Sequence, residues 1–152
     1  MKQAIVFGLL IGLVALVALP GAASGVGFTA GFEPTGLWIL GAVTELSVLE
    51  FLDLRAQVGF ATQQIEGLML ATITAVPHWP MPPVDPFLAF GIGVAMTPPP
   101  YSTGVVVEGS AGVRLVPADM VSILLQARYL MRWTGTTWTS GPVFEGGILI
   151  NF

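Results

Sequence analysis

The side chains that could do chemistry in this sequence are few. It has five basic residues, nine acidic residues, one histidine and no cysteine. Each of the four arginines alternates with apolar neighbours, as in "LDLRAQV" (52–58), so each would lie on the minority face of a strand. An arginine buried on such a face without a partner is costly, and each is therefore expected to meet a carboxylate or water.

The arginines can be paired with carboxylates of the same face. Glu108, Arg128 and Glu145 lie on consecutive predicted strands at comparable depth, which makes them a candidate ion-pair cluster. Such a cluster could plug a narrow interior or gate a minor pore, and the plug is the favoured interpretation. The full set of candidate ion-pair residues is Glu33, Asp53, Arg55, Glu108, Arg114, Arg128, Arg132 and Glu145.

The remaining candidates depend on which predicted strands are neighbours. If the strands close into a barrel, its first and last strands are adjacent. Arg132 and Glu33 are then expected to meet near the outer rim of that barrel. Asp53 and Arg55 are expected to face Arg114 in the lower half of the barrel, away from the outer rim. These expectations ignore the stagger of the strands.

Enzymatic chemistry has little support in the sequence. A hydrolase of the serine type needs a nucleophile with a histidine base within reach, but His78 has no serine close to it in sequence. His78 stands beside Trp79 in a Pro-rich connection, where an interfacial role is the favoured interpretation. One histidine and no cysteine supply no metal-binding set apart from carboxylates, and no phosphate-binding loop is present. No cofactor and no catalytic residue are therefore expected.

The composition indicates a membrane protein. Hydrophobic residues make up 54% of the 152 residues and charged residues only 9%, against roughly 25% in soluble domains. The few basic residues form no stripe for nucleic acid. Membrane lipids are therefore the expected surroundings.

The first 23 residues have the three parts of a secretory signal peptide. Lys2 is followed by an apolar stretch from Ala4 to Leu19, then by Pro20 and small residues, which predicts cleavage near Ala23. An uncleaved membrane anchor is the alternative, because the apolar stretch is close to the length of a membrane-spanning helix.

The rest of the chain, residues 24–152, alternates apolar and small or polar residues in segments of about ten residues. Strands can cross a lipid bilayer only when their sheet closes on itself, so the pattern predicts an all-β, eight-stranded antiparallel up-and-down transmembrane barrel. A soluble barrel is the alternative, but the minority face is mostly small rather than charged. The predicted strands are 26–33, 36–46, 50–62, 67–76, 86–96, 104–115, 121–133 and 142–152.

The sequence also suggests an orientation. With both termini in the periplasm, the inner turns would lie near 47–49, 77–85 and 116–120, and the prolines of 78–85 would hold that connection extended. The last strand places Phe144, Ile148, Ile150 and Phe152 on one face.

These residues resemble the small eight-stranded outer-membrane barrels, the OmpA-like and OmpX-like proteins. "FEGGILINF" looks like that family's C-terminal assembly signal, and "VDPFLAFGIGVAM" and "EGSAGVRLVPADMVSILLQARYL" resemble its fifth to seventh strands. The resemblance implies an outer-membrane location and insertion by the barrel-assembly machinery. The expected function is structural, supporting membrane integrity with a filled lumen; a narrow passive pore and a lipid-modifying enzyme are the alternatives.

Overall fold

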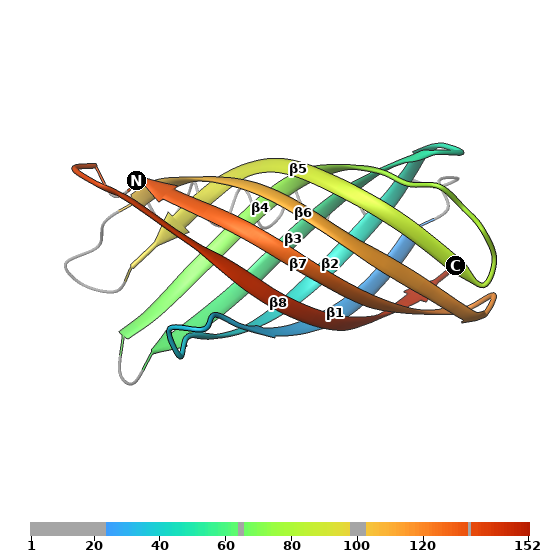
Figure 1. Cartoon of the computed structure of the whole chain (residues 1–152), viewed down its shortest axis with the longest axis horizontal. Helices are drawn as coiled ribbons and strands as arrows, with labels where there is room; N and C mark the ends of the chain where they lie inside the picture. Colours follow the sequence, from blue (N-terminus) through green and yellow to red (C-terminus); the bar gives the residue numbers. More distant parts are fainter. Residues whose placement is uncertain (1–23, 64–65, 98–102, 134) are drawn as a thin grey trace.

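The computed structural model describes residues 24–63, 66–97, 103–133 and 135–152, which form one closed barrel of antiparallel strands (Figure 1). Each strand pairs with its neighbours in sequence, and β1 pairs with β8 to close the sheet. The predicted eight-stranded fold is confirmed. The strands are β1 (Ser24–Phe32), β2 (Trp38–Leu49), β3 (Leu52–Gln63), β4 (Glu66–Pro77), β5 (Val84–Met96), β6 (Thr103–Ala118), β7 (Val121–Trp133) and β8 (Trp138–Asn151).

The predicted signal peptide lies outside the described residues. Within the described part of the chain, no helix is long and apolar enough to cross a membrane. We call the end of the barrel at which β8 finishes the terminal end, and the opposite end the loop end (Figure 1).

The connection between β2 and β3 lies later in the chain than predicted. The sequence prediction placed it at 47–49, but β2 continues to Leu49 through an irregularity in its pairing after Ser47. The turn therefore falls at 50–51. The irregularity adds a residue to one strand without ending the ladder, a feature that alternation alone does not show.

The connection between β4 and β5 is not the extended segment that was predicted. His78 bridges Phe87, and Met81 bridges Val84 through reciprocal backbone hydrogen bonds of 3.0 and 2.9 Å. Trp79 N–H also donates to the Pro86 carbonyl at 3.0 Å. The hairpin therefore continues beyond the end of β4 to a tight turn at 81–84.

The strand β8 begins earlier than predicted, at Trp138 rather than at residue 142. Trp138 lies opposite Trp133 in the register, and the two indole rings are 5.3 Å apart. The Tyr129 hydroxyl donates to the Ser140 hydroxyl at 3.0 Å on the same hairpin. These contacts between outward-facing side chains extend the pairing toward the loop end.

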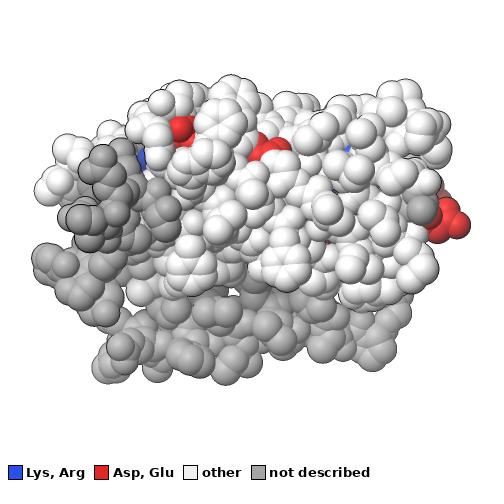
Figure 2. All heavy atoms as spheres, turned by 90° about the horizontal axis from the view of Figure 1, so that it is seen from below, with Lys and Arg blue, Asp and Glu red and all other residues white. Residues whose placement is uncertain are grey.

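The outer wall of the barrel is apolar. Side chains alternate between the wall and the lumen along the strands, as the pleat of a β-sheet requires. The face in Figure 2 consists almost wholly of uncharged side chains over its described part. Large exposed apolar residues on the wall include Phe28, Leu40, Phe60, Ile73, Phe90, Ile92, Leu125, Ile148 and Ile150.

The lumen contains two clusters of buried apolar side chains. The loop-end layer lies toward the loop end, and the terminal-end layer lies toward the end at which β8 finishes. The loop-end layer consists of Leu37, Ile39, Ala61, Leu70, Ala95, Val106, Leu130 and Val143. The terminal-end layer consists of Val43, Val76, Phe87, Ala89, Leu124 and Leu149.

A glycine makes room for one large side chain of the terminal-end layer. A Cβ atom on Gly112 would lie 2.4 Å from the Leu125 carbonyl oxygen and 2.7 Å from the tip of the Phe87 ring. Both distances are too short for a real carbon atom. The missing side chain at Gly112 therefore lets the Phe87 ring fill the lumen there.

Candidate functional site

Three buried charges form a central cluster in the lumen, in which one cation is shared by two carboxylates. Arg128 on β7 lies between Glu108 on β6 and Glu145 on β8. Its Nη1 is 2.7 Å from Glu145 Oε2, and its Nη2 contacts Glu108 Oε2. All three side chains are 3% exposed or less. The structure thus brings together the three residues that the sequence grouped.

Two glutamine side chains join this central cluster to the rest of the lumen. Gln126 donates to Glu145 Oε2 at 3.1 Å, and Gln57 donates both to Glu145 and to the Thr29 hydroxyl. Glu145 therefore receives hydrogen bonds from at least three side chains, Arg128 among them. These bonds replace the water that a buried carboxylate loses. The sequence prediction did not include either glutamine.

A second cluster is built around Glu45, another residue that the sequence prediction left out. Arg55 Nε is 2.6 Å from Glu45 Oε1, and Arg114 Nη2 is 2.9 Å from Glu45 Oε2. Arg55 Nη1 also donates to Gln126 at 2.7 Å, which links the two clusters. The Arg55 guanidinium lies 4.7 Å from the centre of the Phe87 ring. Arg55 and Arg114 therefore bind the same carboxylate, each through a different oxygen of Glu45.

The predicted meeting of Asp53 with Arg114 is present in the structure, and it includes a residue that was not expected. Arg114 Nη2 is 2.9 Å from Asp53 Oδ2, and its Nη1 is 3.6 Å from Asp85 Oδ2. His78 Nδ1 is 3.0 Å from Asp85 Oδ1. The second imidazole nitrogen, Nε2, is 3.7 Å from Asp53 Oδ1. We call these four residues the mouth cluster, because they lie at the terminal end of the lumen.

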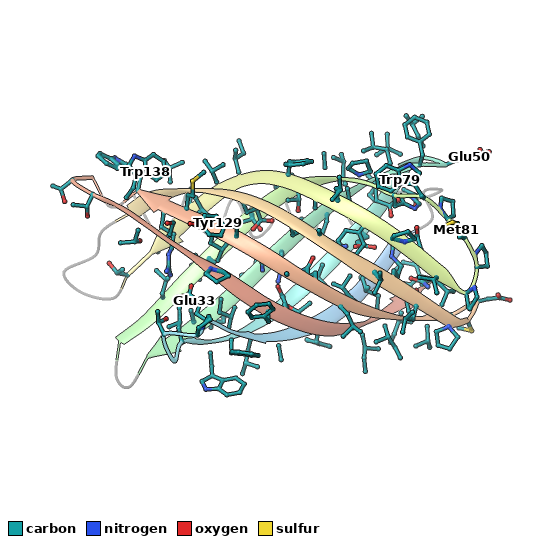
Figure 3. All side chains as sticks on the ribbon, in the orientation of Figure 1. Glu33, Glu50, Trp79, Met81, Tyr129 and Trp138 are labelled. Carbon is teal, nitrogen blue, oxygen red and sulfur yellow. The ribbon has the colours of Figure 1, made fainter. Side chains whose placement is uncertain are left out.

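The interfacial role expected for His78 is wrong. His78 is only 8% exposed, whereas the adjacent Trp79 is 53% exposed on the outside of the barrel (Figure 3). Because β4 keeps its alternation past Pro77, His78 continues the inward row of Thr72, Thr74 and Val76. The histidine therefore belongs to the lumen.

The remaining predicted pair lies at the loop end. Arg132 Nη2 is 3.1 Å from Glu33 Oε1, and the Thr35 hydroxyl donates to Glu33 Oε2 at 3.2 Å. The tight turn after β1, in which Gly36 has a φ of 94° and donates its N–H to the Glu33 carbonyl, brings Thr35 back over the carboxylate. This pair is more exposed than the central cluster, with 15% of the Arg132 side chain accessible.

The chemistry available to these residues is charge neutralisation. The described lumen residues include four arginines and six carboxylates, and each of these ten takes part in at least one ion pair. Both ring nitrogens of His78 face carboxylates rather than a hydroxyl nucleophile. No group of three or more potential ligands in the described part of the chain could hold a metal ion.

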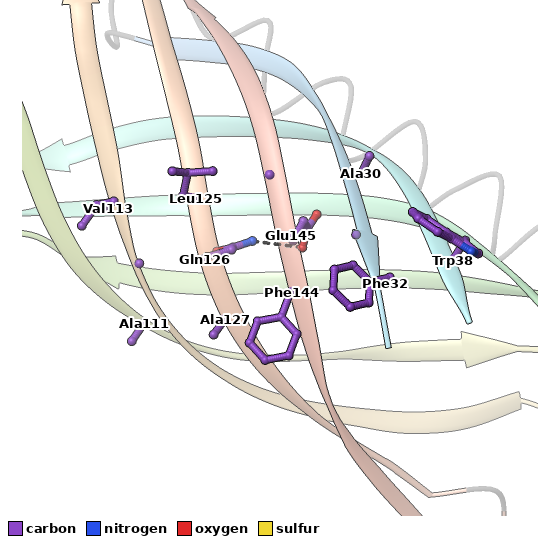
Figure 4. Close-up of a pocket in the computed structure, with 13 residues that line it drawn as sticks. Ala30, Phe32, Trp38, Ala111, Val113, Leu125, Gln126, Ala127, Phe144 and Glu145 are labelled. Atoms are coloured by element: carbon purple, nitrogen blue, oxygen red, sulfur yellow. Dashed lines mark hydrogen bonds between the residues drawn. The ribbon is translucent and has the colours of Figure 1, made fainter. Parts of the chain in front are cut away.

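The outer wall is hollowed where small side chains meet. A shallow groove of about 480 Å³ crosses β6, β7, β8 and β1, with Ala111, Ala127 and Ala30 on its floor and Phe144 and Phe32 beside it (Figure 4). The Gln126 and Glu145 side chains point away from the groove into the lumen, where they are hydrogen bonded. The outward-facing lining of the groove is therefore apolar.

The last strand presents the predicted apolar face to the outside. Phe144, Ile148, Ile150 and Phe152 are 46%, 58%, 55% and 68% exposed, respectively. Of the inward residues between them, Glu145 and Leu149 are buried. The same strand therefore supplies both a lumen carboxylate and part of the apolar wall.

The fold is shared with solved membrane barrels. No protein-family model and no curated protein matches the sequence. The N-terminal β-barrel domain of Pseudomonas aeruginosa OprF is similar, with a TM-score of 0.72, 10% identity, and coverage of 87% of this chain and 100% of that one. Neisserial surface protein A is similar with a TM-score of 0.66 and 12% identity, covering 86% and 96% of the two chains.

A third similar structure belongs to an enzyme. The outer-membrane enzyme PagL matches with a TM-score of 0.59 and 12% identity, over 83% of this chain and 98% of that one. At such identities the likeness concerns the fold and not the activity. The chain therefore has the fold of the small eight-stranded outer-membrane β-barrels.

Proposed function

We propose that this protein is an exported outer-membrane barrel with a structural role, which adds a sealed barrel to the membrane and supports its integrity. The observation that carries the proposal is the filled lumen. Arg128 is held between two buried carboxylates, and the loop-end layer closes the space above this cluster with apolar side chains. A barrel of eight strands has an interior that side chains can fill completely.

The outer wall supports a membrane location. The described strands have 9 to 16 residues, and about 9–11 residues suffice for a tilted strand to cross the hydrocarbon core. A closed barrel leaves no unpaired strand edge in lipid. Outer-membrane lipids are therefore the proposed partners. The signal-peptide pattern in residues 1–23 and the apolar ending at Phe152 further support export and insertion by the barrel-assembly machinery.

The two alternatives have weaker support. A pore for small solutes would require the central cluster and the loop-end layer to move aside together, because both fill the lumen. A lipid-modifying enzyme would need a reactive group at the surface of the barrel. The lone histidine is instead buried among carboxylates, so we infer a non-enzymatic role.

Cysteine labelling tests the location and the orientation, because the chain has no cysteine of its own. Pro34 and Glu50 are both exposed, at the loop end and at the terminal end. In intact cells a membrane-impermeant maleimide should label P34C but not E50C, and it should label both once the outer membrane is permeabilised. Equal labelling of the two variants in intact cells would contradict the orientation, and recovery in the soluble fraction would contradict the location.

The structural role itself is tested by deletion of the gene. Cells that lack the protein should take up more of a hydrophobic dye, and the wild-type gene should restore the barrier. An unchanged dye uptake under envelope stress would argue against a role in membrane integrity.

A further inference from the structure

The mouth cluster contains two buried polar atoms that face each other without a bond. Among the described residues, His78 Nε2 and Asp53 Oδ1 find no hydrogen-bond partner, although they are 3.7 Å apart. Asp53 is 1% exposed and His78 is 8% exposed, so water does not replace the missing partner freely. A buried polar group left unpaired is unfavourable.

The number of protons on the imidazole explains this arrangement. A carboxylate can only accept a hydrogen bond, so the bond to Asp85 places the first ring proton on Nδ1. In the neutral ring Nε2 then carries a lone pair that points at an oxygen of Asp53. If the ring gained its second proton, on Nε2, that nitrogen would become a donor and Asp53 Oδ1 its acceptor. One hydrogen bond would then satisfy both atoms.

The carboxylates around the terminal mouth outnumber the arginines. From β2, β3 and β5 the lumen receives Glu45, Asp53 and Asp85, which are balanced by Arg55 and Arg114. Three carboxylates therefore share two guanidinium groups. A protonated His78 would make the third cation. Two further carboxylates, Glu50 and Asp119, lie in turns at this end of the barrel, but both are exposed. Glu50 precedes Phe51, whose carbonyl accepts a hydrogen bond from the His78 backbone N–H.

We propose that His78 is a proton-operated clamp on the terminal mouth of the barrel. When the ring binds a second proton, it bridges Asp85 of β5 and Asp53 of β3 and fastens the 78–84 turn to the strands on both sides of it. When the ring is neutral, the link to Asp53 is absent, and the turn is held by its backbone hydrogen bonds and by the bond from His78 to Asp85. Histidine is the side chain whose charge ordinarily changes between about pH 5 and 8, so the clamp responds to the acidity of its compartment. This inference does not depend on the proposed structural role.

The single histidine makes the test direct. In protein labelled with ¹⁵N-histidine and reconstituted in lipid nanodiscs, both ring nitrogens should carry protons at pH 5 and only Nδ1 at pH 8. Amide hydrogen exchange at Trp79 and Met81, corrected for its intrinsic dependence on pH, should slow by about threefold to tenfold on acidification, the factor expected for one added hydrogen bond. The amide of Glu33, bonded across the opposite turn, is the internal control.

Two variants locate the effect. In H78Q the side chain does not titrate, so the corrected exchange should not depend on pH. In D53N the amide group can donate to the neutral ring, so exchange should remain slow at both pH values. The proposal would be overturned if the ring stayed neutral at pH 5, or if the corrected exchange of the wild type were the same at both pH values. A dependence of exchange on pH in either folded variant would also overturn it.

Discussion

The central ion-pair cluster predicts a large loss of stability when its only cation is removed. In R128M the methionine keeps much of the apolar stem of the side chain but leaves Glu108 and Glu145 as two buried carboxylates without a cation. Removing one partner of a buried ion pair costs about 3–5 kcal/mol. Because Glu145 keeps its bonds from Gln57 and Gln126, we expect about 3 kcal/mol rather than the upper value.

A matched variant separates the loss of the cation from the loss of packing. In the triple variant R128M/E108Q/E145Q no charge remains to be compensated, so most of the lost stability should return. The assay is urea-dependent unfolding in phospholipid vesicles, followed by tryptophan fluorescence. If R128M lost less than about 1 kcal/mol, the range of an exposed pair, or if the triple variant were no more stable than R128M, the reasoning about burial would be refuted.

Three further predictions concern the ends of the barrel and its packing. In G112A the new methyl group collides with Phe87 and with the strand behind it, so we expect a loss of about 1–3 kcal/mol in the same unfolding assay, and an unchanged stability would contradict the close approach. In R132A the partly exposed pair with Glu33 is lost, and the cost should stay at or below about 1 kcal/mol; a loss equal to that of R128M would be the contrary result. Deletion of Phe152 should reduce insertion in cells far more than it lowers the stability of refolded barrel, as measured by heat-modifiable migration in gels; equal assembly of the truncated protein would count against an assembly signal.

Much of the fold could be predicted because lipid and lumen impose opposite demands on neighbouring residues. In β3 and β7 the alternation is clean, and the prediction identified the arginines as inward. In β2 the inward residues Ile39 and Val43 are as apolar as the outward ones, so the alternation is weak there. Glu45, which shares that inward row, was consequently not recognised as the partner of Arg55 across the ladder.

The terminal mouth shows what the sequence could not supply. The prediction ended the fourth strand at Val76, because Pro77 and the prolines that follow suggested a loop. Counting onward by two from Val76 reaches His78, and counting back by two from Phe87 reaches Asp85, so the alternation did contain a signal for both residues. The hydrogen bond from Arg55 to Gln126, by contrast, joins β3 to β7 across the lumen. Such contacts depend on the stagger of all eight strands, which no single strand encodes.

Single-channel recording in planar lipid bilayers tests the claim of a sealed lumen most directly. The purified barrel and its R128A variant, each inserted between solutions of concentrated potassium chloride, should show no conductance steps, because the loop-end layer remains closed even when the guanidinium is absent. A porin recorded in the same bilayers provides the positive control. Resolved steps from the wild-type barrel would contradict a sealed lumen, and steps from R128A alone would show that Arg128 is a gate rather than part of a plug.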